Sequence, residues 1–247
     1  MQDELPDTET ETYEHIPWSR LTLTNEAAGR GKWMYFATAL LVAAAIAAAV
    51  DWWAVATSRR STEVTAKPIA MASLLGVALV GGGVPGDVRV ALVVGAALGL
   101  IGDVALLGES DAAFMTGLGA FAVGHIAYVV AAVLVGFDVL WTLPGIAFSA
   151  ILLGTRFVTH TVPGARRAGG DVLAGVVVLY SIVISVMVSS AWATRIWLAA
   201  VGAMLFAFSD WMLGYQRFVN RVRHGRLAVI VPYHVGQAML IVGLAVA

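Results

Sequence analysis

Apolar residues occur along the chain in long runs that short polar or glycine-rich segments separate. A membrane-spanning helix needs about 20 consecutive, mostly apolar residues, and about eight segments meet that requirement. They are 33–54, 67–83, 88–107, 112–135, 139–157, 170–190, 195–217 and 227–246. The second is the weakest because it is short and begins at Pro68, although proline is tolerated in a first helical turn. The pattern predicts an all-α, polytopic integral membrane bundle.

The segments between these runs are too short to hold a soluble domain. Turn signals occur in "GGGVPGD" and "HTVPGARRAGGD". We therefore expect a single transmembrane helical domain over residues 33–247. Residues 1–32 are acidic and contain no apolar run, which excludes a secretory signal peptide. They are expected to form a largely disordered tail.

Composition supports a membrane protein. Hydrophobic residues make up 60% of the chain and charged residues 13%, against about 25% charged residues in soluble domains. The absence of cysteine excludes disulfides, thiolate metal sites and a cysteine nucleophile. A net charge of −1 favours no nucleic-acid partner.

Positive charges predict the orientation of the bundle. With eight spans both termini lie on one side of the membrane. The loops on that side carry Arg20, Arg30, Lys32, Arg89 and Arg195. The opposite loops carry the other Lys and Arg residues: Arg59, Arg60, Lys67, Arg156, Arg166, Arg167, Arg217, Arg221, Arg223 and Arg226. Because basic loops face the cytoplasm, we expect the termini outside the cell membrane and the more basic loops inside.

Two pairs of segments resemble each other across the chain. "GDVALLG" in the third run resembles "SDWMLGY" in the seventh, and "GHIAY" in the fourth resembles "YHVGQ" in the eighth. Four helices separate the members of each pair, so each pair has one orientation. This suggests a 4+4 parallel repeat of the kind found in some transporters, although chance also explains so short a match.

Two aspartates interrupt the apolar runs. Asp103 shares a helix face with Gly95 and Gly99, and Asp210 shares one with Ala207 and Ala203. Small residues at this spacing let another helix approach closely, so both carboxyl groups are expected to point into the bundle. Both lie near the same, more basic end. Capping or pairing at the membrane edge would explain one such aspartate, but ionisable residues inside membrane helices are usually functional.

Two carboxyl groups at matching depth suit acid–base chemistry. Close carboxylates do not readily ionise together, so one retains its proton. A protonated acid beside an ionised base is the equipment of general acid–base hydrolysis. We therefore predict Asp103 and Asp210 as the catalytic residues of one shared site.

Other polar residues near the same end are candidates for substrate binding: Lys67, His125, Tyr128, Tyr180, Ser209, Arg217, Tyr233 and Gln237. Several have structural alternatives. His125, Tyr128 and Tyr180 also fit hydrogen-bonded core residues, and the Ser209 hydroxyl could bond back to its own helix.

Known motifs exclude several other chemistries. The chain has no G-x-S-x-G elbow of a serine hydrolase and no H-E-x-x-H zinc motif or phosphate-binding loop. "GLIGD" departs from the G-x-G-D of intramembrane aspartyl proteases because residue 101 is Ile. We expect no metal and no cofactor.

The segments together resemble the YhhN-type lysoplasmalogenase family of membrane proteins. The similar elements, in chain order, are "TAKP" at 65–68, "GDVALL" at 102–107, "F..G...F..GHIAY" at 114–128, "LYSIVISVM" at 179–187, "GAMLFAFSDWML" at 202–213 and "YHVGQ" at 233–237. They cover most of the predicted membrane domain. The Thr-Lys-Pro of the family is interrupted here by Ala66.

The resemblance implies hydrolysis of the vinyl ether bond of lysoplasmalogens to a fatty aldehyde and a glycerophospho-base, with water and without a redox cofactor. Its expected partners are the lysophospholipid substrate and the surrounding bilayer. In this hypothesis Asp103 and Asp210 divide the acid and base roles. Tyr233 and Gln237 orient water or glycerol, and Lys67 or Arg217 holds the phosphate.

Two other classes of function stay open at the level of sequence. A proton-coupled transporter would also use buried carboxylates and a repeat, and it would move a substrate without making a product. A lipid-binding membrane protein without catalysis would keep its lipid when both aspartates are changed to asparagine.

Overall fold

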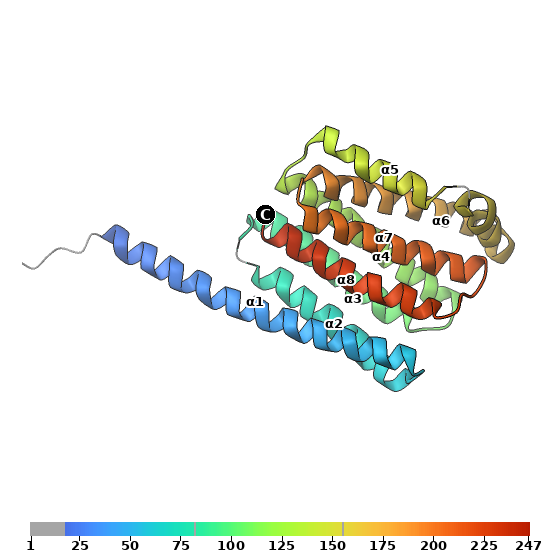
Figure 1. Ribbon diagram of the computed structural model, residues 1–247, viewed down its shortest axis with the longest axis horizontal. Helices are drawn as coiled ribbons and strands as arrows, with labels where there is room; N and C mark the ends of the chain where they lie inside the picture. The colour runs from blue at the N-terminus through green and yellow to red at the C-terminus, as the bar shows by residue number, and fades with distance from the viewer. Residues whose placement is uncertain (1–17, 82, 155) are drawn as a thin grey trace, which may run out of the picture.

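The computed structural model describes the backbone of residues 18–247 apart from residues 82 and 155, and the side chains from residue 34 onward. Within these limits the chain forms eight α-helices: α1 Trp18–Ala56, α2 Arg60–Val80, α3 Gly86–Leu106, α4 Asp111–Val135, α5 Thr142–Leu152, α6 Val162–Ala193, α7 Trp197–Phe218 and α8 Gly225–Ala245. Two short helical turns, η1 Val139–Trp141 and η2 Phe157–Thr161, flank α5. Consecutive helices run up and down the bundle (Figure 1).

Among the residues that the structure describes, seven helical segments are long and apolar enough to cross a membrane, so the predicted polytopic membrane bundle is confirmed. The segment expected at 139–157 is shorter than predicted, because the apolar helix there ends at Leu152. Gly154 follows this end, and η2 replaces the last turn of the expected span. The shorter apolar helix has 14 residues, from Val139 to Leu152. These extend about 21 Å at 1.5 Å per residue, which is less than the roughly 30 Å thickness of the hydrocarbon core.

Two predicted helix starts also differ from the structure. Helix α2 begins at Arg60, so Pro68 lies inside it rather than in its first turn. Helix α1 begins at Trp18, within the segment expected to be a disordered tail. Once a helix exists, each added residue gains a hydrogen bond at little further cost, which favours such an extension. Residues 1–17 of the predicted tail lie outside the described residues.

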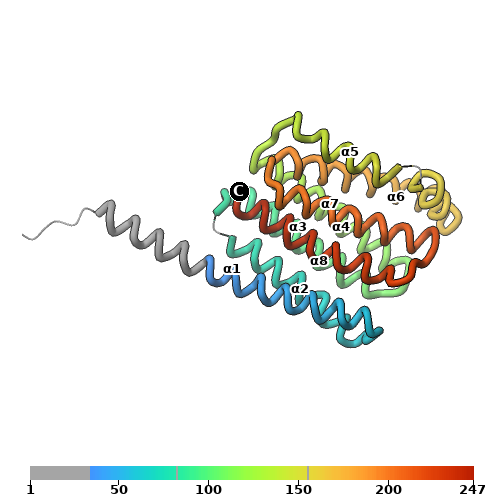
Figure 2. Tube along the Cα trace, viewed as in Figure 1, coloured from blue at the N-terminus to red at the C-terminus, as the bar shows by residue number. Residues whose placement is uncertain are grey.

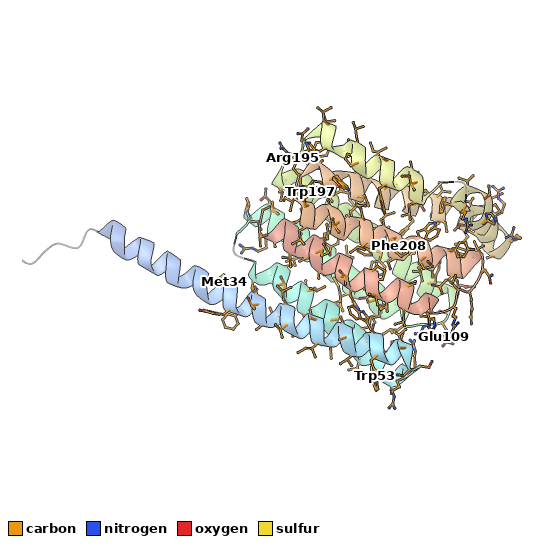
Figure 3. All side chains as sticks on the ribbon, in the orientation of Figure 1. Met34, Trp53, Glu109, Arg195, Trp197 and Phe208 are labelled. Atoms are coloured by element: carbon orange, nitrogen blue, oxygen red, sulfur yellow. The ribbon has the colours of Figure 1, made fainter. Side chains whose placement is uncertain are left out.

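The helices pack as successive hairpins. Helix α1 lies along α2, α3 along α4, α5 along α6, and α7 along α8, and the tube in Figure 2 shows these neighbours. Figure 3 shows Arg195 and Trp197 at one end of the bundle and Glu109 at the opposite end. We call the end that contains residues 57–59, 107–110, 153–154, 156–161 and 219–224 the basic end.

Glycines set the closest helix contacts. Helices α7 and α8 meet at Gly202 and Gly236, where a Cβ built on Gly236 would lie 2.7 Å from the Phe206 backbone nitrogen and 2.8 Å from the Gly202 carbonyl oxygen. Helices α3 and α4 meet in the same way, with a Cβ on Gly124 lying 3.2 Å from the Gly95 carbonyl oxygen. Small residues at interfaces allow such approach between membrane helices.

Gly236→Ala should destabilise the bundle, because its new methyl group meets backbone atoms that cannot rotate away. Overpacking of this kind costs about 1–3 kcal/mol. Gly175→Ala is the matched control, since a Cβ there meets nothing within 4 Å. Thermal unfolding in detergent measures both variants. Equal unfolding midpoints for the two variants would contradict the close α7–α8 contact.

Candidate active site

Asp103 lies on α3 in a buried, hydrogen-bonded group near the basic end. Its side chain forms an ion pair with Lys67 of α2, with 3.1 Å between Lys67 Nζ and Asp103 Oδ1. The hydroxyl of Tyr233, from α8, donates to Asp103 Oδ2 at 2.7 Å. Asp103 is fully buried, and we call these three residues the Asp103 group. Burial of a charge is costly unless it is paired and hydrogen-bonded, and this aspartate has both kinds of partner.

The glycines of α3 make room for this part of the bundle. A Cβ on Gly99 would lie 2.8 Å from the side-chain nitrogen of Gln237, and one on Gly102 would lie 2.6 Å from the Phe121 ring. The small-residue face of α3 was predicted to let a helix approach closely. It also seats side chains from α8 and α4 beside Asp103.

Asp210 lies on α7 in a second group. The Tyr180 hydroxyl, from α6, donates a hydrogen bond to Asp210 Oδ2. His125 Nε2, from α4, lies 3.4 Å from the same oxygen and 3.1 Å from the Tyr180 hydroxyl. We call Asp210, Tyr180 and His125 the Asp210 group. The Asp210 side chain is 11% exposed, whereas that of Asp103 is 1% exposed.

Two phenylalanines connect the groups. The Phe121 ring lies 6.4 Å from the His125 ring and 5.8 Å from the Tyr233 ring, measured between centroids. The Phe206 ring lies 4.8 Å and 5.2 Å from the same two rings. Within the described part of the chain, no hydrogen bond joins the two aspartates. The structure therefore places them in two linked groups, and their sharing of one site stays a prediction.

The two groups are built from corresponding helices. Each aspartate comes from the first helix of a tight pair, α3–α4 or α7–α8, and contacts an aromatic side chain from the second helix of the other pair. The remaining partner comes from α2 in one group and from α6 in the other. These are the helix pairs in which the sequence suggested a 4+4 repeat.

A pocket with an empty volume of about 740 Å³, which includes open solvent, lies beside the Asp210 group. Asp210 and Tyr180 line it, and apolar residues form most of the remaining wall. Residues of α4 to α7 in this wall include Phe114, Leu118, Leu152, Ile184, Trp211 and Leu213. Ligand pockets are typically apolar with a few placed polar groups. This pocket combines an apolar wall with a carboxyl group and a phenol.

The pocket extends toward the basic end. Phe157 and Thr161 of the π-helical turn η2 line it together with Phe218 at the end of α7. Such turns occur frequently at functional sites. Beside them, the Arg217 guanidinium lies 4.9 Å from the centroid of Phe114, another wall residue, and pairs with Asp111. A positive charge therefore lies next to the apolar wall.

The other candidate residues have structural surroundings of their own. Tyr128 is buried, and its hydroxyl has no hydrogen-bond partner among the described residues. The Ser209 hydroxyl donates to the Val229 carbonyl oxygen of α8 at 2.8 Å, rather than to its own helix as the alternative suggested. Gln237 Nε2 lies 3.5 Å from the sulfur of Met71. None of these three residues lines the pocket.

Sequence reasoning missed the pocket wall and a further buried acid. Thr161, Ser181 and Ser185 line the pocket, yet none of them is among the predicted site residues: Ser181 and Ser185 lie in the run 170–190, and Thr161 lies in the turn segment before it. Asp51, in the first apolar run, is fully buried. The signal that singled out Asp103, a carboxylate within an apolar helix, also applied to Asp51.

Among the described residues, no group of three or more His, Cys, Asp or Glu side chains is arranged to hold a metal ion.

Comparison with known proteins identifies the family of this chain. No curated protein and no solved structure matches the chain. The model of the YhhN family matches residues 62–244, from the start of α2 to the end of α8, and includes both aspartate groups. The chain belongs to the YhhN family.

Proposed function

We propose that this protein is a lysoplasmalogenase that cleaves the vinyl ether bond of lysoplasmalogens in the pocket beside Asp210. The observation that carries the proposal is the Asp210 carboxyl group, with Tyr180 bonded to it, on the wall of an apolar pocket. An alkenyl chain suits the apolar wall, and a vinyl ether needs a proton donor. Membership of the YhhN family supports the same activity.

The first step uses Asp210 in its protonated form. The π electrons of the vinyl ether take the Asp210 proton at the carbon β to the ether oxygen, forming a C–H bond. The ether oxygen stabilises the resulting cation, and the ionised Asp210 carboxylate lies beside that positive charge. Stabilisation of charge that develops during reaction is usually the largest catalytic effect. Tyr180 and His125 are positioned to fix the orientation of the carboxyl group.

Water completes the reaction. A water molecule adds to the carbon attached to the ether oxygen, and its proton goes to the Asp210 carboxylate, which restores the acid. The resulting hemiacetal loses its hydroxyl proton as the bond from carbon to the glycerol oxygen breaks. The glycerol oxygen takes up a proton, so the products are a fatty aldehyde and a glycerophospho-base. One carboxyl group thus acts first as acid and then as base.

This mechanism assigns different roles to the aspartates. Asp103 does not line the pocket and is paired with Lys67. We propose it as a positioning residue that acts through Tyr233, Phe121 and Phe206. Lys67 is then a partner of Asp103 rather than a ligand of the phosphate.

The substrate phosphate is proposed to bind Arg217, which lies beside the pocket wall at the basic end. A guanidinium binds phosphate through two parallel hydrogen bonds. The excess of basic residues at this end favours a cytoplasmic location for it. The substrate would therefore enter from the cytoplasmic face of the cell membrane, with its chain in the pocket.

Arg217→Gln should raise KM for a lysoplasmalogen with little change in kcat, because the phosphate contact lies away from the reacting bond. Loss of hydrogen bonds to a charged group costs about 1.5–3 kcal/mol, which corresponds to a KM increase of roughly tenfold to a hundredfold. Arg223→Gln, an exposed arginine at the same end, is the control. Steady-state assays in detergent measure both. An unchanged KM in the Arg217 variant would remove this phosphate site.

The function is tested with three matched lysophospholipids that differ only at the sn-1 bond: vinyl ether, saturated ether and ester. Purified protein in detergent should release aldehyde from the first and no product from the other two, because only the vinyl ether forms a stabilised cation on protonation. Fatty acid from the ester would instead indicate a lysophospholipase. If no lipid is cleaved, uptake into proteoliposomes and lipid binding distinguish a transporter from a lipid-binding protein.

A further inference from the structure

Helix α1 carries a buried carboxylate that the proposed reaction does not use. Asp51 is 0% exposed, and neither of its carboxylate oxygens has a hydrogen-bond partner in the described part of the chain. Helix α1 also lies outside the residues matched to the YhhN family. An unpartnered carboxylate in a membrane bundle is costly. The residues around Asp51 therefore indicate which groups could provide its missing hydrogen bonds.

The packing of α1 on α2 places Asp51 beside Lys67. Ala47 and Ala48 of α1 form one apolar cluster with Ala70 of α2, and the two helices are antiparallel neighbours. Because the helices are antiparallel, a position four residues after Ala47 on α1 lies opposite a position about four residues before Ala70 on α2. In this register Asp51 lies opposite residues 66 and 67.

The third member of this region is His234 of α8, which is 3% exposed. The indole nitrogen of Trp52, the residue after Asp51, lies 3.1 Å from His234 Nδ1. An indole N–H can only donate, so Nδ1 is the acceptor and the neutral imidazole carries its proton on Nε2. That Nε2–H is buried and has no acceptor among the described residues.

The other charged groups at this end of α2 and α8 already have partners. Glu63 of α2 pairs with Arg60 at 3.1 Å and with Arg226 of α8 at 2.5 Å. Asp103 of α3 is bound by Lys67 and Tyr233. The Lys67 ammonium has three N–H donors, and its 3.1 Å ion pair with Asp103 Oδ1 occupies at most one of them. Lys67 and His234 thus keep donors, and Asp51 is a carboxylate without a donor.

We propose that Asp51, Lys67 and His234 form a buried water-binding site that holds the Lys67 ammonium against Asp103. A buried water needs two to four polar partners, and these residues offer both donors and acceptors. Water bridges groups that do not touch directly, as is the case for Asp51 here. Asp51 is then a positioning residue for the Asp103 group, supplied by α1.

Nitrogen NMR of the histidine rings tests the site. The chain has five histidines, and His234→Gln identifies the His234 resonances in protein labelled with ¹⁵N-histidine. The wild-type ring should be the neutral tautomer with its proton on Nε2. Asp51→Leu removes the acceptor oxygens and should shift the Nε2 resonance. Asp51→Asn keeps a side-chain oxygen and should leave this resonance close to its wild-type position, as should Val50→Ala, an exposed neighbour on α1.

Either of two results would overturn the proposal: a wild-type proton on Nδ1, or an Nε2 resonance that Asp51→Leu leaves unchanged. If the leucine variant does not fold, Asp51→Ala provides the second test, because it removes the same oxygens from a smaller side chain and should shift the Nε2 resonance in the same way. A further readout rests on the proposed function: Asp51→Leu should lose kcat at unchanged KM, since Asp51 does not line the pocket. The NMR result is independent of substrate, so it distinguishes failure of this site from failure of the proposed activity.

Discussion

Asp210→Asn is expected to abolish aldehyde release from a lysoplasmalogen while the protein still folds and inserts. The amide cannot give a proton to the vinyl ether carbon or accept one from water. General acid–base catalysis contributes about 10²–10⁴-fold to a rate, so kcat should fall by at least that factor. The change preserves side-chain size, and Asp210 keeps some exposure to the pocket. Steady-state release of aldehyde measures the effect.

Asp171→Asn is the matched control for this experiment. Asp171 is exposed and pairs with Arg166 outside the pocket, so its loss should leave kcat unchanged. Tyr180→Phe keeps the aromatic ring on the pocket wall but removes the donor to Asp210. We expect it to retain partial activity. Full activity of the Asp210 variant would exclude this carboxyl group as the proton donor.

The second large effect is on stability. Asp103→Asn removes the negative charge beside Lys67, whose Nζ lies 3.1 Å from Asp103 Oδ1 in a region where the lysine side chain is only 11% exposed. Loss of one member of a buried pair costs about 3–5 kcal/mol, because Lys67 then loses the carboxylate that it contacts directly. The variant should therefore unfold at a markedly lower temperature in detergent. Its activity should also fall.

A double variant separates charge from packing. Lys67→Met combined with Asp103→Leu removes both charges and keeps apolar volume, and replacement of a buried pair in this way is often neutral. The double variant should be more stable than Asp103→Asn alone. A single variant as stable as the wild type would show that Lys67 does not depend on Asp103.

Sequence patterns predicted the membrane bundle because apolar length and helix count need no knowledge of contacts. They also identified both aspartates, since a carboxylate in an apolar run is conspicuous in any membrane helix. Lys67, Tyr233, His125 and Tyr180 were named as candidates, and the structure places them against the aspartates. Which partner belongs to which aspartate depends on how α2, α4, α6 and α8 surround α3 and α7.

The pocket and the Asp51 region could not be predicted from local patterns. The pocket wall combines residues from six elements, and its commonest residues are leucines and phenylalanines, which look the same in sequence wherever they pack. The π-helical turn at Phe157–Thr161 lies where the span expected at 139–157 is shortened, and the positive φ of Gly170 lies at the start of the next expected span. Asp51 becomes informative only when the register of α1 on α2 brings it to Lys67.

The most direct test of vinyl ether hydrolysis at Asp210 is mass spectrometry of the product formed in D₂O from a synthetic lysoplasmalogen. Protonation at carbon predicts a fatty aldehyde with one deuterium on the carbon next to the carbonyl, produced by the wild-type protein and not by Asp210→Asn. No aldehyde from folded wild-type protein, or the same deuterated aldehyde at an equal rate from the variant, would contradict the account.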